Sequence, residues 1–302
     1  MNNKLLFIVG ALLLVNACFA DYIHDNAGEY GFKFLNIPVN PVSLALAGRP
    51  ADPVENSASF IIQPAISTLE KSRSVGASQS KWISDTNNTN LYYSYSNRRS
   101  HFGLAMRNLS YGEIEKRDEY GNIIGYYNPM DLNVCANYGL RLTPSQYIGI
   151  NAGVVYEKIS TASALGFSTD LGYTWLPPFP DMIVSLAVRN LGYGGKMNDE
   201  TLKLPLAAEL DISKTYTRDN TSVRLAVSAT QSLDEQLKGT FGTELGFWNT
   251  LYLRAGYKIN YSAEDLTAGI GIRYDHFGVD YGWASFTDNL SDVHSLGLSY
   301  YF

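Results

Sequence analysis

Apolar and polar side chains alternate along most of this chain, from about residue 72 to the C-terminus. Residues 165–175 show the pattern: Leu, Phe, Tyr and Trp lie on one face, whereas Gly, Ser and Asp lie on the other. Strict alternation predicts strands with a single apolar face, and the region lacks the period of a long helix. The predicted strands are 72–83, 89–97, 101–109, 130–142, 146–157, 163–175, 182–190, 204–214, 221–231, 239–248, 250–259, 266–275, 277–286 and 293–302.

The lengths of these segments and of their connections point to a membrane. Most segments approach the roughly 9–11 residues with which a tilted strand crosses a bilayer. Short and longer connections alternate, with the odd-numbered ones mostly longer, and the longest are 110–129 and 191–203. Outer-membrane barrels have short periplasmic turns and longer outer loops, and an even strand count returns the C-terminus to the periplasmic side.

A soluble β-sandwich is the alternative, because its strands also alternate between an apolar and a polar face. The polar faces here are rich in Gly and Ser with scattered charges, and Tyr and Trp recur at strand ends, where an interfacial girdle would lie. Only a closed sheet pairs every backbone group within a bilayer. We therefore predict an all-β fold: a transmembrane antiparallel up-and-down β-barrel of about fourteen strands over residues 71–302.

The first seventy residues have a different character. Residues 1–20 carry Lys4, an apolar stretch and a small-residue cleavage region, which predict an export signal removed after Ala20. Lipidation at Cys18 is the alternative. Residues 21–70 are proline-rich without sustained alternation and predict an N-terminal plug or latch segment, which either gates the lumen or packs in it as a passive strap. Without residues 1–20 only Cys135 remains, so no disulfide within the chain is expected.

The chemistry-bearing residues suggest no enzyme. The four histidines are scattered without metal-ligand spacing, no catalytic or cofactor motif is present, and the mild acidic excess argues against nucleic acid. The predicted lumenal charges have mixed signs, which favours a paired network holding the plug over a polar substrate path. They are Arg107, Arg141, Glu157, Asp170, Arg189, Glu209, Asp211, Arg224, Glu244, Arg254, Lys258, Arg273 and Asp280.

The N-terminal part resembles the signature of the PorV/PorQ family of outer-membrane proteins. The matching elements are Ala27-Gly28, Phe34 to Ile37, Leu44 to Gly48, and the plug motif Gln63-Pro64-Ala65. The chain departs from the family pattern at Gln63, where Asn is usual, and at Ile66, where Gly is usual. The wider relatives are FadL-like fourteen-stranded transporters of hydrophobic compounds.

This resemblance implies passage or secretion across the bacterial outer membrane, as an accessory of type IX secretion with other secretion components as partners. The alternatives are FadL-like transport of a hydrophobic ligand, which enters through the outer loops and leaves through the wall, or a structural barrel without transport. The last strand ends in Leu298, Tyr300 and Phe302. This ending resembles the assembly signal that the barrel-insertion machinery reads, and it predicts contact with outer-membrane lipid.

Overall fold

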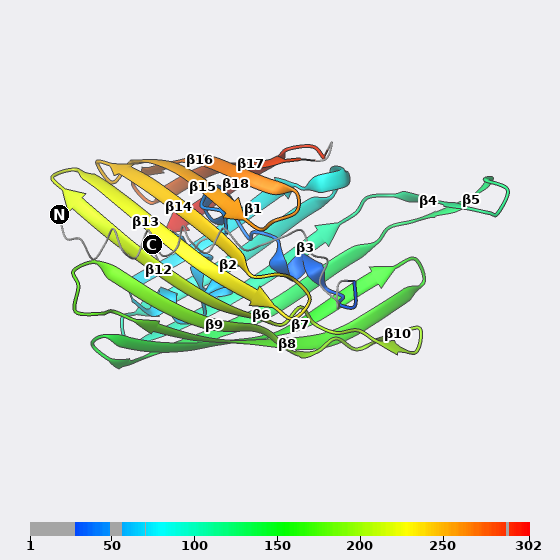
Figure 1. Cartoon of the computed structure of the whole chain (residues 1–302), viewed down its shortest axis with the longest axis horizontal. Helices are drawn as coiled ribbons and strands as arrows, with labels where there is room; N and C mark the ends of the chain where they lie inside the picture. Colours follow the sequence, from blue (N-terminus) through cyan, green and yellow to red (C-terminus); the bar gives the residue numbers. More distant parts are fainter. Residues whose placement is uncertain (1–27, 49–55, 70, 288–289) are drawn as a thin grey trace.

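In a computed structural model, which describes residues 28–48, 56–69, 71–287 and 290–302, fourteen strands form a closed antiparallel barrel (Figure 1). The predicted fold class and strand number are therefore confirmed. The strands are β1 (Lys71–Lys81), β2 (Asn87–Asn97), β3 (Ser100–Ser110), β6 (Met130–Thr143), β7 (Gln146–Ile159), β8 (Ala162–Trp175), β9 (Met182–Tyr193), β12 (Ala207–Arg218), β13 (Thr221–Ser232), β14 (Lys238–Phe247), β15 (Leu251–Ile259), β16 (Glu264–Tyr274), β17 (Phe277–Phe286) and β18 (Val293–Tyr301). β1 pairs with β18 and closes the ring.

The alternating pattern places the apolar side chains on the outside of the barrel. On β18, Leu296 and Leu298 are more than half exposed, whereas Ser295 is 2% exposed and faces inward. In water, the barrel would expose a continuous apolar surface around its whole outer face, and soluble monomers rarely have such a surface. The exposed belt is the surface that a lipid bilayer covers.

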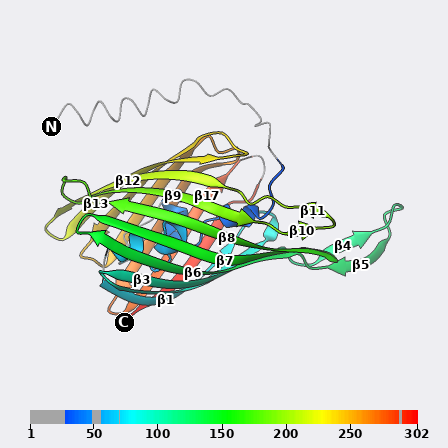
Figure 2. The ribbon, with the colours of Figure 1, turned by 90° about the horizontal axis from the view of Figure 1, so that it is seen from below.

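The two ends of the barrel differ in their connections. At one end the strands are joined by turns such as 98–99, 144–145, 219–220 and 275–276, and the C-terminus lies at this end (Figure 2). At the other end, residues 111–129 form a ribbon of β4 (Ile114–Arg117) and β5 (Ile123–Tyr127) that projects well beyond the barrel (Figure 1). We call these the short-turn end and the long-loop end.

The long-loop end also contains a small sheet of β10 (Lys196–Met197) and β11 (Glu200–Thr201), within the connection from β9 to β12. The odd-numbered connections are predicted to be mostly longer, and the fifth, between β7 and β8, is an exception of only residues 160–161. Ser160 has a φ of 52°. The left-handed conformation lets two long strands turn tightly where the sequence has no glycine.

The described part of residues 21–70 lies inside the barrel, and we call residues 28–48 and 56–69 the inner segment. It contains η2 (Lys33–Asn36), α2 (Pro41–Ala45), α3 (Ser59–Ile62) and η3 (Ile66–Thr68), and η4 (Ile83–Asp85) follows β1. None of these helices in the described residues is long and apolar enough to cross a membrane. The segment runs from the long-loop end, where Gly31 N–H donates to Lys203 O at 3.0 Å, to β1 at the short-turn end.

Lumenal glycines let the inner segment lie close to the wall. A Cβ at Gly269 would meet the Ala45 methyl at 2.5 Å, and one at Gly282 would meet the Pro41 carbonyl oxygen at 2.5 Å. On the opposite side a Cβ at Gly149 would overlap the carbonyl of Pro64. The core is therefore the contact between the inner segment and the strand wall, which includes a cluster of Val39, Ala58, Phe60, Ile61, Ile62, Tyr92, Ala105 and Cys135.

We expect Gly149→Ala to lower the free energy of unfolding by about 1–3 kcal/mol, the usual effect of overpacking. The added methyl group meets backbone atoms of Pro64 and Ala65, which cannot rotate away. Urea denaturation in detergent, followed by the different gel migration of folded and boiled barrel, measures the change. Gly239→Ala is the control, because its Cβ would have ordinary contacts of 3.6 Å. Equal stability of the two variants would contradict this packing.

Candidate functional site

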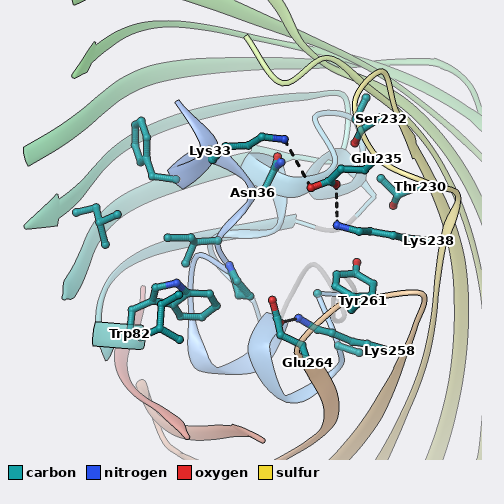
Figure 3. A pocket seen from close by; sticks show the side chains of 18 of the residues that line it. Lys33, Asn36, Trp82, Thr230, Ser232, Glu235, Lys238, Lys258, Tyr261 and Glu264 are labelled. Atoms are coloured by element: carbon teal, nitrogen blue, oxygen red, sulfur yellow. Dashed lines mark hydrogen bonds and ion pairs between the residues drawn. The ribbon is translucent and has the colours of Figure 1, made fainter. Parts of the chain in front are cut away.

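A cavity of about 730 Å³ opens at the long-loop end, above the inner segment (Figure 3). Its floor is formed by residues 33–38 together with Ala47 and Gly48 of that segment. Its walls are the outer ends of β12 to β17 and the connections 82–86 and 233–237. The volume is within the range of small-molecule sites.

One side of the cavity carries compensated charges. Lys238 Nζ lies 2.7 Å from Glu235 Oε2, and Lys33 Nζ lies 3.6 Å from Glu235 Oε1 (Figure 3). Burial alone would raise the pKa of Glu235, but Lys238 and Lys33 outweigh it and hold this pKa below its ordinary value. Lys258 pairs with Glu264, and Arg189 lies 3.2 Å from Glu209.

Aromatic and aliphatic side chains form the rest of the lining. Tyr261 lies between two ammonium groups, with Lys238 at 4.7 Å and Lys258 at 4.8 Å from the ring centroid. On the other side Trp82 and Phe286 pack edge to face, with centroids 5.6 Å apart. The further apolar lining residues are Phe34, Ile37, Pro38, Ile83 and Leu109. The cavity thus has a mixed lining, in which an apolar part lies beside paired charges.

Two arginines hold the floor of the cavity in place. The Arg107 guanidinium donates to the carbonyl oxygens of Phe34 and Leu35 at 3.1 Å and of Ile37 at 2.8 Å. Arg189 donates to the Leu35 carbonyl at 3.2 Å. These carbonyls belong to the C-terminal end of η2, where intrahelical donors are lacking and a cation is favourable. Arg107 is 2% exposed, so its buried side chain links β3 to the inner segment.

A hydrogen-bonded belt anchors the middle of the inner segment. It runs across six neighbouring strands through Ser94, His101, Asn137, Asn151, Asp170 and Asn190, with distances of 2.5 to 3.0 Å. Asn137 also donates to Pro64 O, and Asn151 to Phe60 O, both at 3.0 Å. Since the Asn137 amide oxygen accepts, His101 Nδ1 donates to it and Nε2 accepts from Ser94.

A buried ion network fills the opposite wall near the short-turn end. Arg254 Nε lies 2.6 Å from Glu244, and Arg254 Nη1 lies 2.8 Å from Asp280. Arg273 lies 3.0 Å from the other oxygen of Asp280. The network links β14, β15, β16 and β17, and the Arg254 side chain has no exposed surface. Each of these four side chains thus has a partner of opposite charge.

The structure places the predicted plug motif against the wall. Gln63 is fully buried, donates to Leu186 O at 2.9 Å and accepts from Ala65 N–H at 3.2 Å. Gly48 has a φ of 86° and lines the cavity, and its N–H donates to Ser43 O. Gln63 takes the place of the expected Asn because its longer side chain reaches across to β9.

Most predicted lumenal charges point inward, but they do not form one site. Eight of them lie within the barrel, divided among the floor, the hydrogen-bonded belt and the ion network: Arg107, Asp170, Arg189, Glu209, Glu244, Arg254, Arg273 and Asp280. Arg224 is also buried, opposite Glu244 in the β13–β14 register. Arg141 is a correction, because it is exposed and its Nε donates to Thr143 O at the short-turn rim. Because β6 ends at this rim, a side chain at an inward position of the alternation lies beyond the lumen there.

Sequence reasoning missed Lys33, Glu235, Lys238, Tyr261 and Glu264, which lie at strand ends or outside the strands, where no periodic pattern exists. Leu298 and Phe302 are exposed on the outer face, as an assembly signal would require. The proposed signal peptide and Cys18 lie outside the described residues. Among the residues that the structure does describe, no cluster of His, Cys, Asp or Glu is arranged to hold a metal ion.

Several solved structures have a similar fold. The CymD monoaromatic hydrocarbon channel matches with a TM-score of 0.63 and 12% identity over 88% of this chain and 98% of that chain. The Pseudomonas putida toluene transporter TodX gives 0.63 and 11% over 86% and 96%. A Pseudomonas aeruginosa FadL homologue gives 0.54 and 11% over 87% and 98%. No protein-family model and no curated protein sequence matches the chain. The chain therefore shares the fold of FadL-like channels.

Proposed function

We propose that this protein is an outer-membrane channel that takes up small, uncharged hydrophobic molecules through the cavity at its long-loop end. The observation that carries the proposal is the cavity itself: it has an apolar part beside its paired charges, is of small-molecule size, and opens at the end with the longer loops. The fold is shared with proteins described as a monoaromatic hydrocarbon channel and a toluene transporter.

The charges of the cavity favour an uncharged ligand. Each of the cationic and acidic side chains that line it, among the described residues, already has a partner of opposite sign. An ionic ligand would have to break such a pair, and leaving one member unpaired and buried is costly. A neutral ligand gains from leaving water and leaves the pairs intact.

A route through the protein needs movement, because the inner segment fills the lumen below the cavity. The wall has an irregularity between β8 and β9, where the register shifts between Thr169 and Leu171. Asn190 has a φ of 59° there, and its N–H donates to Asp170. A bulge of this kind weakens the ladder locally. The exit opens either by displacement of the inner segment or by separation of β8 from β9 at this bulge.

A secretion role resembling that of PorV/PorQ proteins has weaker support. It rests on the N-terminal elements 34–37, 44–48 and 63–65, and the solved structures of similar fold have titles that name small-molecule channels. Deletion of the gene separates the two functions. A secretion accessory would leave C-terminally signalled cargo in the periplasm, whereas a hydrocarbon channel would leave cargo export normal.

Filling the cavity tests the channel. We expect Ala207→Trp to reduce toluene uptake by bacterial cells that express the barrel at least about tenfold, because the indole ring occupies space in the cavity that the ligand needs. Ala207 lines the cavity, whereas Ala208 on the same strand is exposed on the outer face. Ala208→Trp is therefore the matched control and should leave uptake unchanged. Unchanged uptake by Ala207→Trp, with normal amounts of folded barrel, would contradict the proposal.

A further inference from the structure

Arg224 is a buried arginine outside the floor, the hydrogen-bonded belt and the ion network. It points into the lumen from β13, near the short-turn end, and is 5% exposed. Among the described residues, its Nε and Nη1 atoms have no hydrogen-bond partner. The guanidinium group is always charged in a protein and carries several N–H donors. A charged group rich in donors therefore lies in the lumen with some of its donors unused.

The carboxylates of this part of the lumen are engaged by other groups. Glu244 is opposite Arg224 in the β13–β14 register, but its Oε2 accepts from Arg254 Nε at 2.6 Å. Asp280 lies 2.8 Å from Arg254 as well. Asp211 on β12 lies nearer the middle of the lumen and has an interaction of its own. None of these three described carboxylates accepts from Nε or Nη1 of Arg224.

Hydroxyl groups flank Arg224 on the same lumenal face. Thr215 on β12 is opposite Arg224 in the register, and Ser222 is the next inward residue of β13 toward the short-turn end. Ser222 is in turn opposite Thr217. Hydroxyl groups donate hydrogen bonds and carry no charge that would repel an anion. The lumenal face around Arg224 thus offers N–H and O–H donors together.

This face is accessible from the short-turn end. Along β12 the inward side chains change from buried Asp211 through partly exposed Thr215 to exposed Thr217. Ser222 on the neighbouring strand is also partly exposed. The exposure increases toward the turn 219–220, which lies at the opposite end of the barrel from the cavity. A soluble ion at the short-turn end can therefore approach Arg224 from that side.

We propose that Arg224, Thr215 and Ser222 bind a small oxyanion of the phosphate class at the short-turn mouth of the lumen. A guanidinium group presents a planar set of donors that matches two oxygens of one phosphate. Burying a charge without a partner is costly, and an anion bound beside Arg224 removes that cost. The three side chains face the lumen and not the lipid, which favours a soluble anion over a phospholipid headgroup. The site is independent of the cavity and of uptake through it.

Equilibrium dialysis of the full mature barrel against radiolabelled inorganic phosphate tests this inference. The barrel is kept in a non-ionic detergent at constant ionic strength, with chloride as the other anion. We expect the wild type to bind phosphate, and Arg224→Met to bind it at least about tenfold more weakly, because one charged hydrogen-bonding group is lost. Arg224→Lys keeps the charge without the planar fork, so its affinity should lie between the two.

Arg218→Met is the matched control. It removes an exposed cation at the same end of the barrel, on β12, and should leave phosphate binding unchanged. Heat-dependent gel migration verifies that each variant is folded. An absence of phosphate binding by the wild type would overturn the proposal, and so would equal affinities of the wild type and Arg224→Met.

A carboxylate of the chain itself is the competing occupant. Asp52 and Glu55 lie outside the described residues, and the variant D52N/E55Q tests them as partners of Arg224. We expect this variant to bind phosphate with the affinity of the wild type. Phosphate binding that appears only in D52N/E55Q would show that one of these carboxylates occupies the position, and this result would also overturn the proposal.

Discussion

Arg254→Met is expected to lower the free energy of unfolding by about 3–5 kcal/mol, the usual effect of removing one partner from a buried ion pair. Arg254 contacts Glu244 at 2.6 Å and Asp280 at 2.8 Å. Both carboxylates stay buried when the guanidinium group is removed. Glu244 and Asp280 would then remain as buried anions on β14 and β17. Urea titration of the folded fraction in detergent measures the loss.

Two further variants test the cause of the loss. Arg218→Met removes a cation whose partner is Asp219, but both side chains are more than 90% exposed, so stability should change by less than about 1 kcal/mol. The double variant E244Q/R254M neutralises Glu244, which has lost Arg254, while Asp280 keeps Arg273, so it should recover part of the lost stability. Equal stability of Arg254→Met and Arg218→Met would show that the ion network does not stabilise the barrel.

Arg107→Met is expected to release the floor of the cavity without unfolding the barrel. Three carbonyl oxygens lose a charged donor. Leu35 O keeps Arg189 and Phe34 O keeps the Ile37 N–H, so among the described residues Ile37 O is the acceptor left unpaired, at a cost of about 1–3 kcal/mol. The native thiol of Cys135 reports the release, because it is 7% exposed and packs in a cluster with Phe60 and Val39 of the inner segment. A water-soluble maleimide should label it at least about tenfold faster in the variant.

The conservative change Arg107→Lys is the matched control. An ammonium group keeps the charge but cannot donate to three carbonyls from one planar fork, so the labelling rate should lie between those of the wild type and Arg107→Met. Both variants should retain the heat-dependent gel migration of a folded barrel. If Cys135 of Arg107→Met were labelled at the same rate as in the wild type, the floor would be held by packing alone.

The alternating pattern predicted the barrel well. Side chains of a wall strand face either the lumen or the outer surface, and the two environments alternate along the sequence. The predicted strand 130–142 corresponds to Met130–Thr143. The predicted start at residue 204 is wrong, since β12 begins at Ala207. Leu204 and Leu206 continue the apolar alternation, but Pro205 lacks an N–H for the ladder, and its carbonyl accepts from Asn190.

The cavity could not be predicted in the same way, because its residues come from segments without a period. Lys33 belongs to the inner segment, whereas its partner Asp234 lies in the connection between β13 and β14. Only the closed ring brings these residues together. The inward charges were identified from alternation, but which of them pair depends on the register between strands, as for Arg189 and Glu209.

The position of the inner segment also constrains the order in which the molecule can assemble. Its start lies at the long-loop end, beside Lys203, and its end leads into β1 at the short-turn end. If the ring closed first, this chain would have to thread lengthwise through a finished cylinder whose glycines leave no spare room. The pairing of β1 with β18, between residues as distant as Ser74 and Tyr301, is therefore the last event. The sheet must curl around its own N-terminal segment before the two edges meet.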